Sequence, residues 1–124
     1  ESRPAAWGTS WPFAEYVKHD WAGAWICSLF RKECEGLAHE FITDAVAATR
    51  YVWADVPRLG MVTFIDPKHV KPIQRRGVDV WGYSYLKAGF RNIGHTKGGL
   101  VALQLLPSDM PEPAMAYGTQ LEFA

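Results

Sequence analysis

A short polar loop in front of a predicted helix carries residues that could bind a phosphate group. The loop ends in Glu33-Cys34-Glu35-Gly36-Leu37-Ala38. The first backbone N–H groups of a helix lack partners, the helix dipole favours negative charge there, and small residues let a pyrophosphate approach closely. Gly36 and Ala38 therefore suit a phosphate cradle. The alternative is an ordinary strand-to-helix turn, which Glu33 and Glu35 favour because carboxylates repel phosphate.

A second segment with chemical potential is GYSYLKAGF, at Gly82–Phe90. In this order along the chain, the two segments resemble two motifs of the GNAT acyltransferases. The family's Gln/Arg-x-x-Gly-x-Gly/Ala loop matches Glu33-x-x-Gly36-x-Ala38, apart from Glu33. Its aromatic-Tyr-x-x-x-Gly-Phe stretch places Tyr85 on the family tyrosine, with Ser84 in place of the aromatic residue.

The resemblance implies an acyltransferase that moves an acyl group from acetyl-CoA or another acyl-CoA to an amine. It implies that Tyr85 is the acid that protonates the departing thiolate. A phenol has a reference pKa of about 10 and is protonated at neutral pH. A core aromatic is the alternative role for Tyr85. The cofactor-binding residues expected from the resemblance are Leu29, Phe30, Arg31 and Lys32 along the pantetheine arm, and Cys34, Glu35, Gly36, Leu37 and Ala38 at the pyrophosphate.

Several residues could serve as the general base. Glu40 lies near the predicted helix start, and Asp66 ends a predicted strand, where ligands of α/β proteins gather. His39 and His69 could titrate near neutrality. Each of these side chains could equally be a surface or capping residue. Glu40 and Asp66 are the catalytic candidates beside Tyr85.

The elements that must position these residues follow from periodicity. Ala24–Phe30 and Gly60–Ile65 are short apolar runs, typical of buried strands. Between them, Leu37–Ala54 has apolar residues at three- and four-residue spacing, which predicts a helix, and Pro57 follows its end. A strand, a helix and a strand with short loops predict a βαβ unit with parallel strands.

The second half of the chain predicts smaller elements. Asp66–Gly77 has two prolines and predicts a loop. Val80–Ala88 predicts a short helix stopped by Gly89, a residue that favours a left-handed cap. Phe90–Lys97 and Leu100–Leu106 flank Gly98-Gly99 and predict an antiparallel hairpin.

These elements predict one domain over residues 1–124, of α/β (α+β) class, with a GNAT-like mixed sheet. Residues 24–106 form the expected core. Residues 1–23 are expected to be irregular, with a short helix at Pro12–Lys18, and residues 107–124 to be a Pro-rich irregular tail. The family has three strands before the one expected at Ala24–Phe30, so the N-terminal, acceptor-binding part is expected to be reduced, or to lie on a missing or partner segment.

Composition narrows the function classes. The formal net charge is zero, which disfavours a wholesale nucleic-acid binder. The basic run Lys68, His69, Lys71, Arg75 and Arg76 could still contact phosphates, since some members of the superfamily modify phage DNA bases, or it is a solvated loop. No apolar run is long enough for a membrane span, and we expect a cytoplasmic protein. The two cysteines predict neither a disulfide framework nor a metal site, and Cys27 is expected to be buried and inert.

A different class of function also fits the pattern. The chain could be a non-catalytic acyl-CoA-binding or protein-interaction module that kept the cradle. A reduced N-terminal part with Trp7, Trp11 and Trp21 leaves one side of the sheet poorly covered, so we expect a homodimer.

Overall fold

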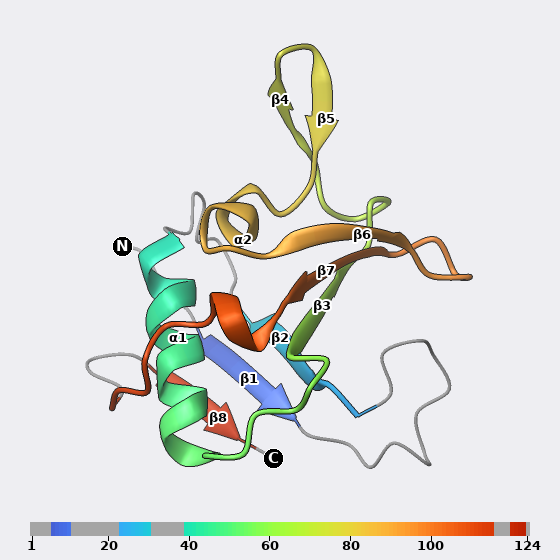
Figure 1. Cartoon of the computed structure of the whole chain (residues 1–124). Coiled ribbons are helices and arrows are strands. Elements are labelled where there is room, and N and C mark those ends of the chain that lie inside the picture. The colour runs from blue at the N-terminus through green and yellow to red at the C-terminus, as the bar shows by residue number, and fades with distance from the viewer. Residues whose placement is uncertain (1–5, 11–22, 31–38, 116–119, 124) are drawn as a thin grey trace.

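The computed structural model describes residues 6–10, 23–30, 39–115 and 120–123 (Figure 1). Within these residues a mixed sheet of six strands has the order β6-β7-β3-β2-β1-β8, and a separate two-stranded hairpin is formed by β4 and β5. Two α-helices, α1 and α2, and a short 3-10 helix, η2, complete the arrangement. The expected mixed sheet with helices is therefore present.

The predicted βαβ unit is confirmed. Strand β2 (Trp25–Phe30), helix α1 (His39–Val52) and strand β3 (Met61–Ile65) follow one another, and β2 and β3 are parallel neighbours. Helix α1 buries Ile42, Ala45, Val46 and Thr49, which repeat at helical spacing. The observed bounds differ from the predicted ones by one or two residues, and residues 37 and 38 lie outside the described chain.

The predicted C-terminal hairpin and short helix are also confirmed. Strands β6 (Arg91–His95) and β7 (Val101–Leu105) pair antiparallel. Strand β7 lies between β6 and β3, and it is antiparallel to both. Helix α2 (Tyr83–Lys87) is shorter than predicted and is followed by Gly89 at φ 105°. Only glycine adopts such a φ readily, so the chain turns there into β6.

Both ends of the chain contain strands where we predicted irregular structure. The segment 1–23 contributes β1 (Ala6–Ser10), which pairs antiparallel with β2 along its whole length. The tail contributes η2 (Pro107–Asp109) and β8 (Gln120–Phe123), which pairs parallel with β1. AWGTS and QLEF have little strand signal of their own, and their conformation follows from pairing with neighbouring strands. The helix expected at Pro12–Lys18 lies outside the described residues.

The segment Asp66–Gly77, predicted to be a loop, also differs from the prediction. It holds β4 (Ile73–Arg75), which pairs antiparallel with β5 (Val78–Val80) across the turn Arg76-Gly77. An X-Gly dipeptide between strands is the signal of a two-residue turn, but Arg is an unusual residue before the Gly. The dipeptide Arg76-Gly77 therefore indicates the turn only weakly.

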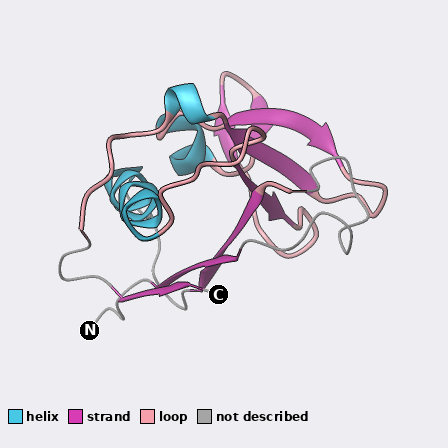
Figure 2. Ribbon diagram, turned by 60° about the horizontal axis from the view of Figure 1, so that its bottom comes forward, coloured by secondary structure: helices cyan, strands magenta, loops and turns pink. Residues whose placement is uncertain are grey.

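The core lies between α1 and the sheet. Its largest fully buried side chains include Trp25, Ile42, Met61, Leu103 and Leu105. The Thr9 and Thr49 hydroxyls lie 3.3 Å apart and form a hydrogen bond that joins β1 to α1. The Ala114 N–H donates a hydrogen bond to the Ala47 carbonyl of the same helix. Figure 2 shows the twist of the sheet, with strands edge-on at one end and face-on at the other. In the part of the chain that the structure describes, no helix is long and apolar enough to cross a membrane.

Candidate functional site

The candidate site lies at the edge where β3 ends and α1 begins. Because β2 and β3 are parallel and α1 connects them, the carboxyl end of β3 and the first turn of α1 share one edge of the sheet. Helix α2 and the β4–β5 hairpin lie toward the same end of the molecule (Figure 1). The fold therefore places the end of β3, the first turn of α1 and helix α2 toward one end of the molecule.

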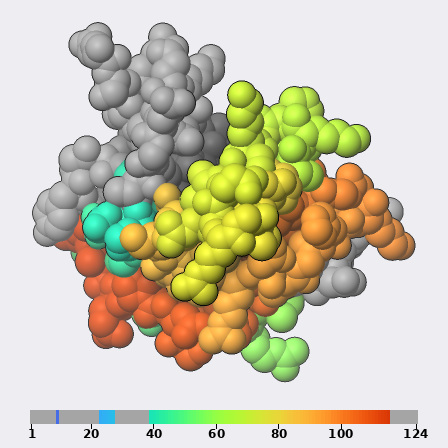
Figure 3. All heavy atoms as spheres, turned by 90° about the horizontal axis from the view of Figure 1, so that it is seen from above, coloured from blue at the N-terminus to red at the C-terminus, as the bar shows by residue number. Residues whose placement is uncertain are grey.

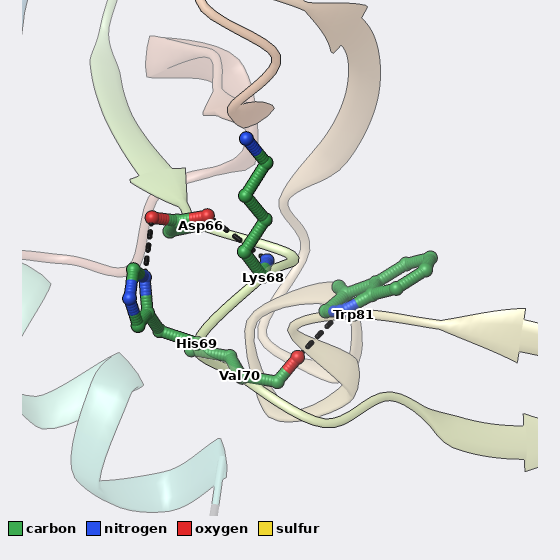
Figure 4. Close-up of polar contacts among 5 residues, drawn as sticks. All are labelled: Asp66, Lys68, His69, Val70 and Trp81. Carbon is green, nitrogen blue, oxygen red and sulfur yellow. Dashed lines mark hydrogen bonds and ion pairs between the residues drawn. The ribbon is translucent and has the colours of Figure 1, made fainter.

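Asp66, directly after β3, forms a hydrogen bond with His69. The Oδ2 atom of Asp66 lies 2.7 Å from Nδ1 of His69 (Figure 4). The His69 side chain is 80% exposed, so it is open to a partner from solvent, whereas the Asp66 side chain is 39% exposed. The Lys68 side chain extends away from this carboxylate, whose other oxygen, Oδ1, accepts the Lys68 backbone N–H at 2.9 Å.

These contacts set the charge of Asp66 and the proton position on His69. The Lys68 N–H, and then the His69 ring, lower the pKa of Asp66 below its ordinary value of 3.8. The carboxylate is ionised at neutral pH and can only accept a hydrogen bond. Nδ1 of His69 must therefore donate, which leaves Nε2 of the neutral imidazole as an acceptor. This pairing of a carboxylate with an imidazole is suited to removing a proton.

The turn that carries Asp66 and His69 is held from two sides. The backbone N–H groups of His69 and Val70 both donate to the Asp66 carbonyl, at 3.1 and 3.0 Å. The Val70 carbonyl accepts a 2.8 Å bond from Nε1 of Trp81, which follows β5 (Figure 4). Trp81 thus ties the turn to the segment that enters α2.

Tyr85, the predicted acid, lies on α2 with its side chain buried in the core. Its ring meets Phe90 edge-on, with centroids 5.1 Å apart. Gly82 begins this helix at φ 70°, and a Cβ there would lie 2.7 Å from Cδ1 of Ile65. Because Ile65 directly precedes Asp66, the start of α2 is packed against the end of β3. The structure brings the segments of Tyr85 and Asp66 together in this way.

Glu40, the other predicted base, is placed differently. It lies in the first turn of α1, with its side chain 71% exposed, and Oε1 is 3.6 Å from Nδ1 of His39. An acidic residue in this turn is favoured by the helix dipole, and this explains Glu40 without a catalytic role. Among the described contacts, Glu40 meets neither Asp66 nor Tyr85.

Two of the predicted cofactor-binding residues lie at the end of β2, past the point where β2 and β3 stop pairing, which leaves an opening in the ladder between them. Strands β2 and β3 pair through only two residue pairs, Trp25 with Met61 and Ile26 with Val62, although both strands continue. Past them, the Thr63 hydroxyl donates to the Cys27 carbonyl at 3.2 Å in place of a ladder bond. Leu29 and Phe30 end β2 beyond this point. The other predicted residues, Arg31, Lys32, Cys34, Glu35, Gly36, Leu37 and Ala38, lie outside the described residues.

Cys27 is not a candidate nucleophile. Burial raises the pKa of its thiol to about 12, so the reactive thiolate is not formed at neutral pH. Its inert character agrees with the sequence prediction. In the described segments, no group of three His, Cys, Asp or Glu side chains could hold a metal ion.

Sequence reasoning missed two contributors to this region. The spacing Asp66-x-x-His69, directly after a strand, could have pointed to the Asp–His pair. Trp81 gave no signal, because its bond to the Val70 carbonyl depends on the β4–β5 hairpin bringing the two segments together.

Comparisons with known proteins give no assignment for this site. No model of a protein family matches the chain, and neither the curated proteins nor the solved structures give a match.

Proposed function

We propose that this chain transfers an acyl group from an acyl-CoA thioester to an amine, as the GNAT resemblance implies. The observation that carries the proposal is the opening between β2 and β3. Strands β2 and β3, which α1 joins, pair with each other through only two residue pairs, and they run on without further pairing toward the edge of the sheet where Asp66 and His69 lie.

An acyl-CoA would bind along this opening. Strand edges offer backbone donors and acceptors to an extended ligand, and a pantetheine arm contains amide groups that can use them. Leu29–Lys32, at the end of β2, would line this arm. The backbone of Cys34–Ala38, in front of α1, would bind the pyrophosphate at the helix start.

The described side chains supply proton transfer. A bound acyl-CoA provides the acyl group as a thioester. The Nε2 atom of His69 accepts the proton of the attacking amine, and Asp66 holds the imidazole in the required tautomer. Tyr85 donates a proton to the departing thiolate, and its ring is held in place by Phe90.

Calorimetry with acetyl-CoA tests cofactor binding. The wild-type chain should bind, and Gly36→Glu should abolish binding by bulk and charge. Ala54→Glu is the matched control, because it adds the same side chain at an exposed position beyond the other end of α1. Absence of binding to the wild type at millimolar acetyl-CoA would refute the proposal. Binding without turnover on any amine would favour the non-catalytic acyl-CoA-binding module.

Tyr85→Phe tests the acid. The variant keeps the ring and its contact with Phe90, so turnover should fall by about 10²–10⁴-fold with cofactor affinity nearly unchanged. Tyr83→Phe is the control, since the Tyr83 ring contacts Arg75 and Lys87 and phenylalanine keeps that ring. Until an acceptor amine is found, release of free thiol from acetyl-CoA measures turnover. Full turnover of Tyr85→Phe with an identified acceptor would show that Tyr85 only packs.

A further inference from the structure

The β4–β5 hairpin projects from the body of the molecule (Figure 1). Residues 73–79 are all exposed, and none belongs to the hydrophobic core. Arg76 and Gly77 form its two-residue turn, with φ of 55° and 77°. Positive φ at both central residues is the type I′ turn, which matches the twist of a hairpin but is costly for a side chain such as Arg.

The hairpin is held firmly at its base although it is exposed at its tip. The bond from Trp81 to the Val70 carbonyl joins the two chain segments that lead into and out of it. The guanidinium of Arg75 lies 4.7 Å from the centre of the Tyr83 ring, which attaches β4 to α2. An isolated two-stranded hairpin is marginal in water, so these anchors give it a fixed position.

The stretch of sequence that contains this hairpin is rich in positive charge. Residues 66–97 contain seven of the 13 Lys and Arg residues but two of the 13 Asp and Glu residues. The zero net charge of the chain therefore conceals a basic region and an acidic remainder. Of the two acids, Asp66 is paired with His69, and Asp79 accepts a hydrogen bond from Gln74. Lys68, Lys71 and Arg76, in contrast, are all exposed.

We propose that the β4–β5 hairpin binds the groove of duplex DNA, with Lys71 and Arg76 on the phosphates. The cations match a polyanion, and each neutralised phosphate releases counterions. In Figure 3 the hairpin, in yellow, stands toward the viewer over the rest of the molecule, as a projecting binding element would.

The shape of the hairpin selects duplex DNA among nucleic acids. The major groove of B-DNA admits a two-stranded ribbon, whereas the major groove of an RNA duplex is too narrow. Single strands are bound by stacking bases on aromatic rings. The exposed apolar side chains of this hairpin are Ile73 and Val78, which are β-branched and offer no such platform.

This inference stands on the hairpin alone, and it also bears on the proposed acyl transfer. Because the hairpin follows the Asp66 turn directly, a bound duplex would lie beside Asp66 and His69. If both proposals hold, the amine acceptor belongs to DNA or to a molecule bound to it. If acetyl-CoA binding fails, the DNA-binding surface is unaffected.

The test is fluorescence anisotropy with a labelled 20-base-pair DNA duplex of arbitrary sequence. The wild type should bind with micromolar affinity at about 50 mM salt, and log K should fall linearly with log salt. Lys71→Gln with Arg76→Gln should weaken binding roughly tenfold and reduce the salt slope by about two. Arg58→Gln with Lys97→Gln removes the same charge from exposed positions outside the hairpin, and it should retain most of the affinity.

Several results would overturn the proposal. These are no binding by the wild type, equal weakening by the two double variants, or equal affinity for a single strand or an RNA duplex of the same length. Circular dichroism of each variant shows whether the fold is kept. Acetyl-CoA calorimetry on the hairpin variant should give the wild-type affinity, which separates this surface from the phosphates of CoA.

Discussion

Strand β3 and the β4–β5 hairpin lie on either side of the Asp66 turn, yet they meet opposite environments. In β3, Met61, Val62 and Thr63 are buried, and the strand pairs with neighbours on both sides. Every residue of β4 is exposed, and the hairpin strands pair only with each other. The first region is held by burial of apolar surface, whereas the second is held by a few polar contacts at its base. Stability and binding should therefore respond to substitutions in different regions.

The largest expected effect tests the core. Trp25→Ala removes a fully buried ring from β2 that packs against Trp53 at a centroid distance of 5.9 Å. The free energy of unfolding should fall by about 3–5 kcal/mol, as for other buried aromatic residues. Val78→Ala, at a side chain 61% exposed in the hairpin, should change it by less than about 0.5 kcal/mol. Urea unfolding measures both values, and similar losses would refute the contrast.

The next effect compares two glycines with nearly the same backbone conformation. Gly82 has φ 70°, and a Cβ there would lie 2.6 Å from Cδ1 of Leu103. Gly82→Ala should cost about 2–4 kcal/mol, since left-handed strain and overpacking add. Gly77 has φ 77° with no atom within 4 Å of its Cβ position, so Gly77→Ala should cost only the left-handed strain, about 1–2 kcal/mol. Equal thermal shifts for both variants would show that space around α2 does not matter.

The same contrast explains what could be predicted from the sequence. Apolar periodicity and the positions of glycines predict the βαβ unit, α2 and the β6–β7 hairpin. These elements are predictable because burial imposes a regular spacing of apolar residues. Strands β1 and β8 depend on partners far away in the chain, and a short segment such as AWGTS does not reveal them. The β4–β5 hairpin buries almost nothing, so it leaves no apolar pattern, and only Arg76-Gly77 signals its turn.

The candidate site was predictable to a similar degree. Asp66 follows from its place at the end of a strand, and the structure adds His69 as its partner. Tyr85 was identified through a motif, but its burial against Phe90 depends on tertiary packing. The homodimer, the acyl-CoA and the role of Gly36 remain predictions, because they concern contacts with other molecules.

A smaller effect tests the turn of the hairpin. Arg76→Asn should make β4–β5 pairing more stable by a few tenths of a kcal/mol, because asparagine tolerates positive φ better than other side chains. Amide hydrogen exchange in residues 73–80 should slow, with no change in global stability. Arg76→Gln removes the same charge without that tolerance and serves as the control. If the two variants exchange at equal rates, strain at Arg76 does not limit the hairpin.

The smallest effect concerns the Asp66 turn that separates the two regions. The pKa of Asp66 is lowered in the folded chain, chiefly by the Lys68 N–H and then by His69. A lowered pKa means that the ionised carboxylate stabilises the fold. This contribution is present above pH 3.8 and is lost as the pH falls through the lower, folded value. The Lys68 amide resonance should therefore titrate below pH 3.8, as the hydrogen bond to the carboxylate weakens.

Asp66→Asn provides the control for this titration. The asparagine amide oxygen can still accept the Lys68 N–H, but it does not titrate, so the resonance should stay flat over the same range. Asp66 is exposed to solvent, and global stability should change little in either case. A Lys68 amide that titrates at or above pH 3.8 in the wild type would mean that the turn does not favour the ionised carboxylate. The contacts of Asp66 with the Lys68 N–H and the His69 ring would then not stabilise the fold at neutral pH.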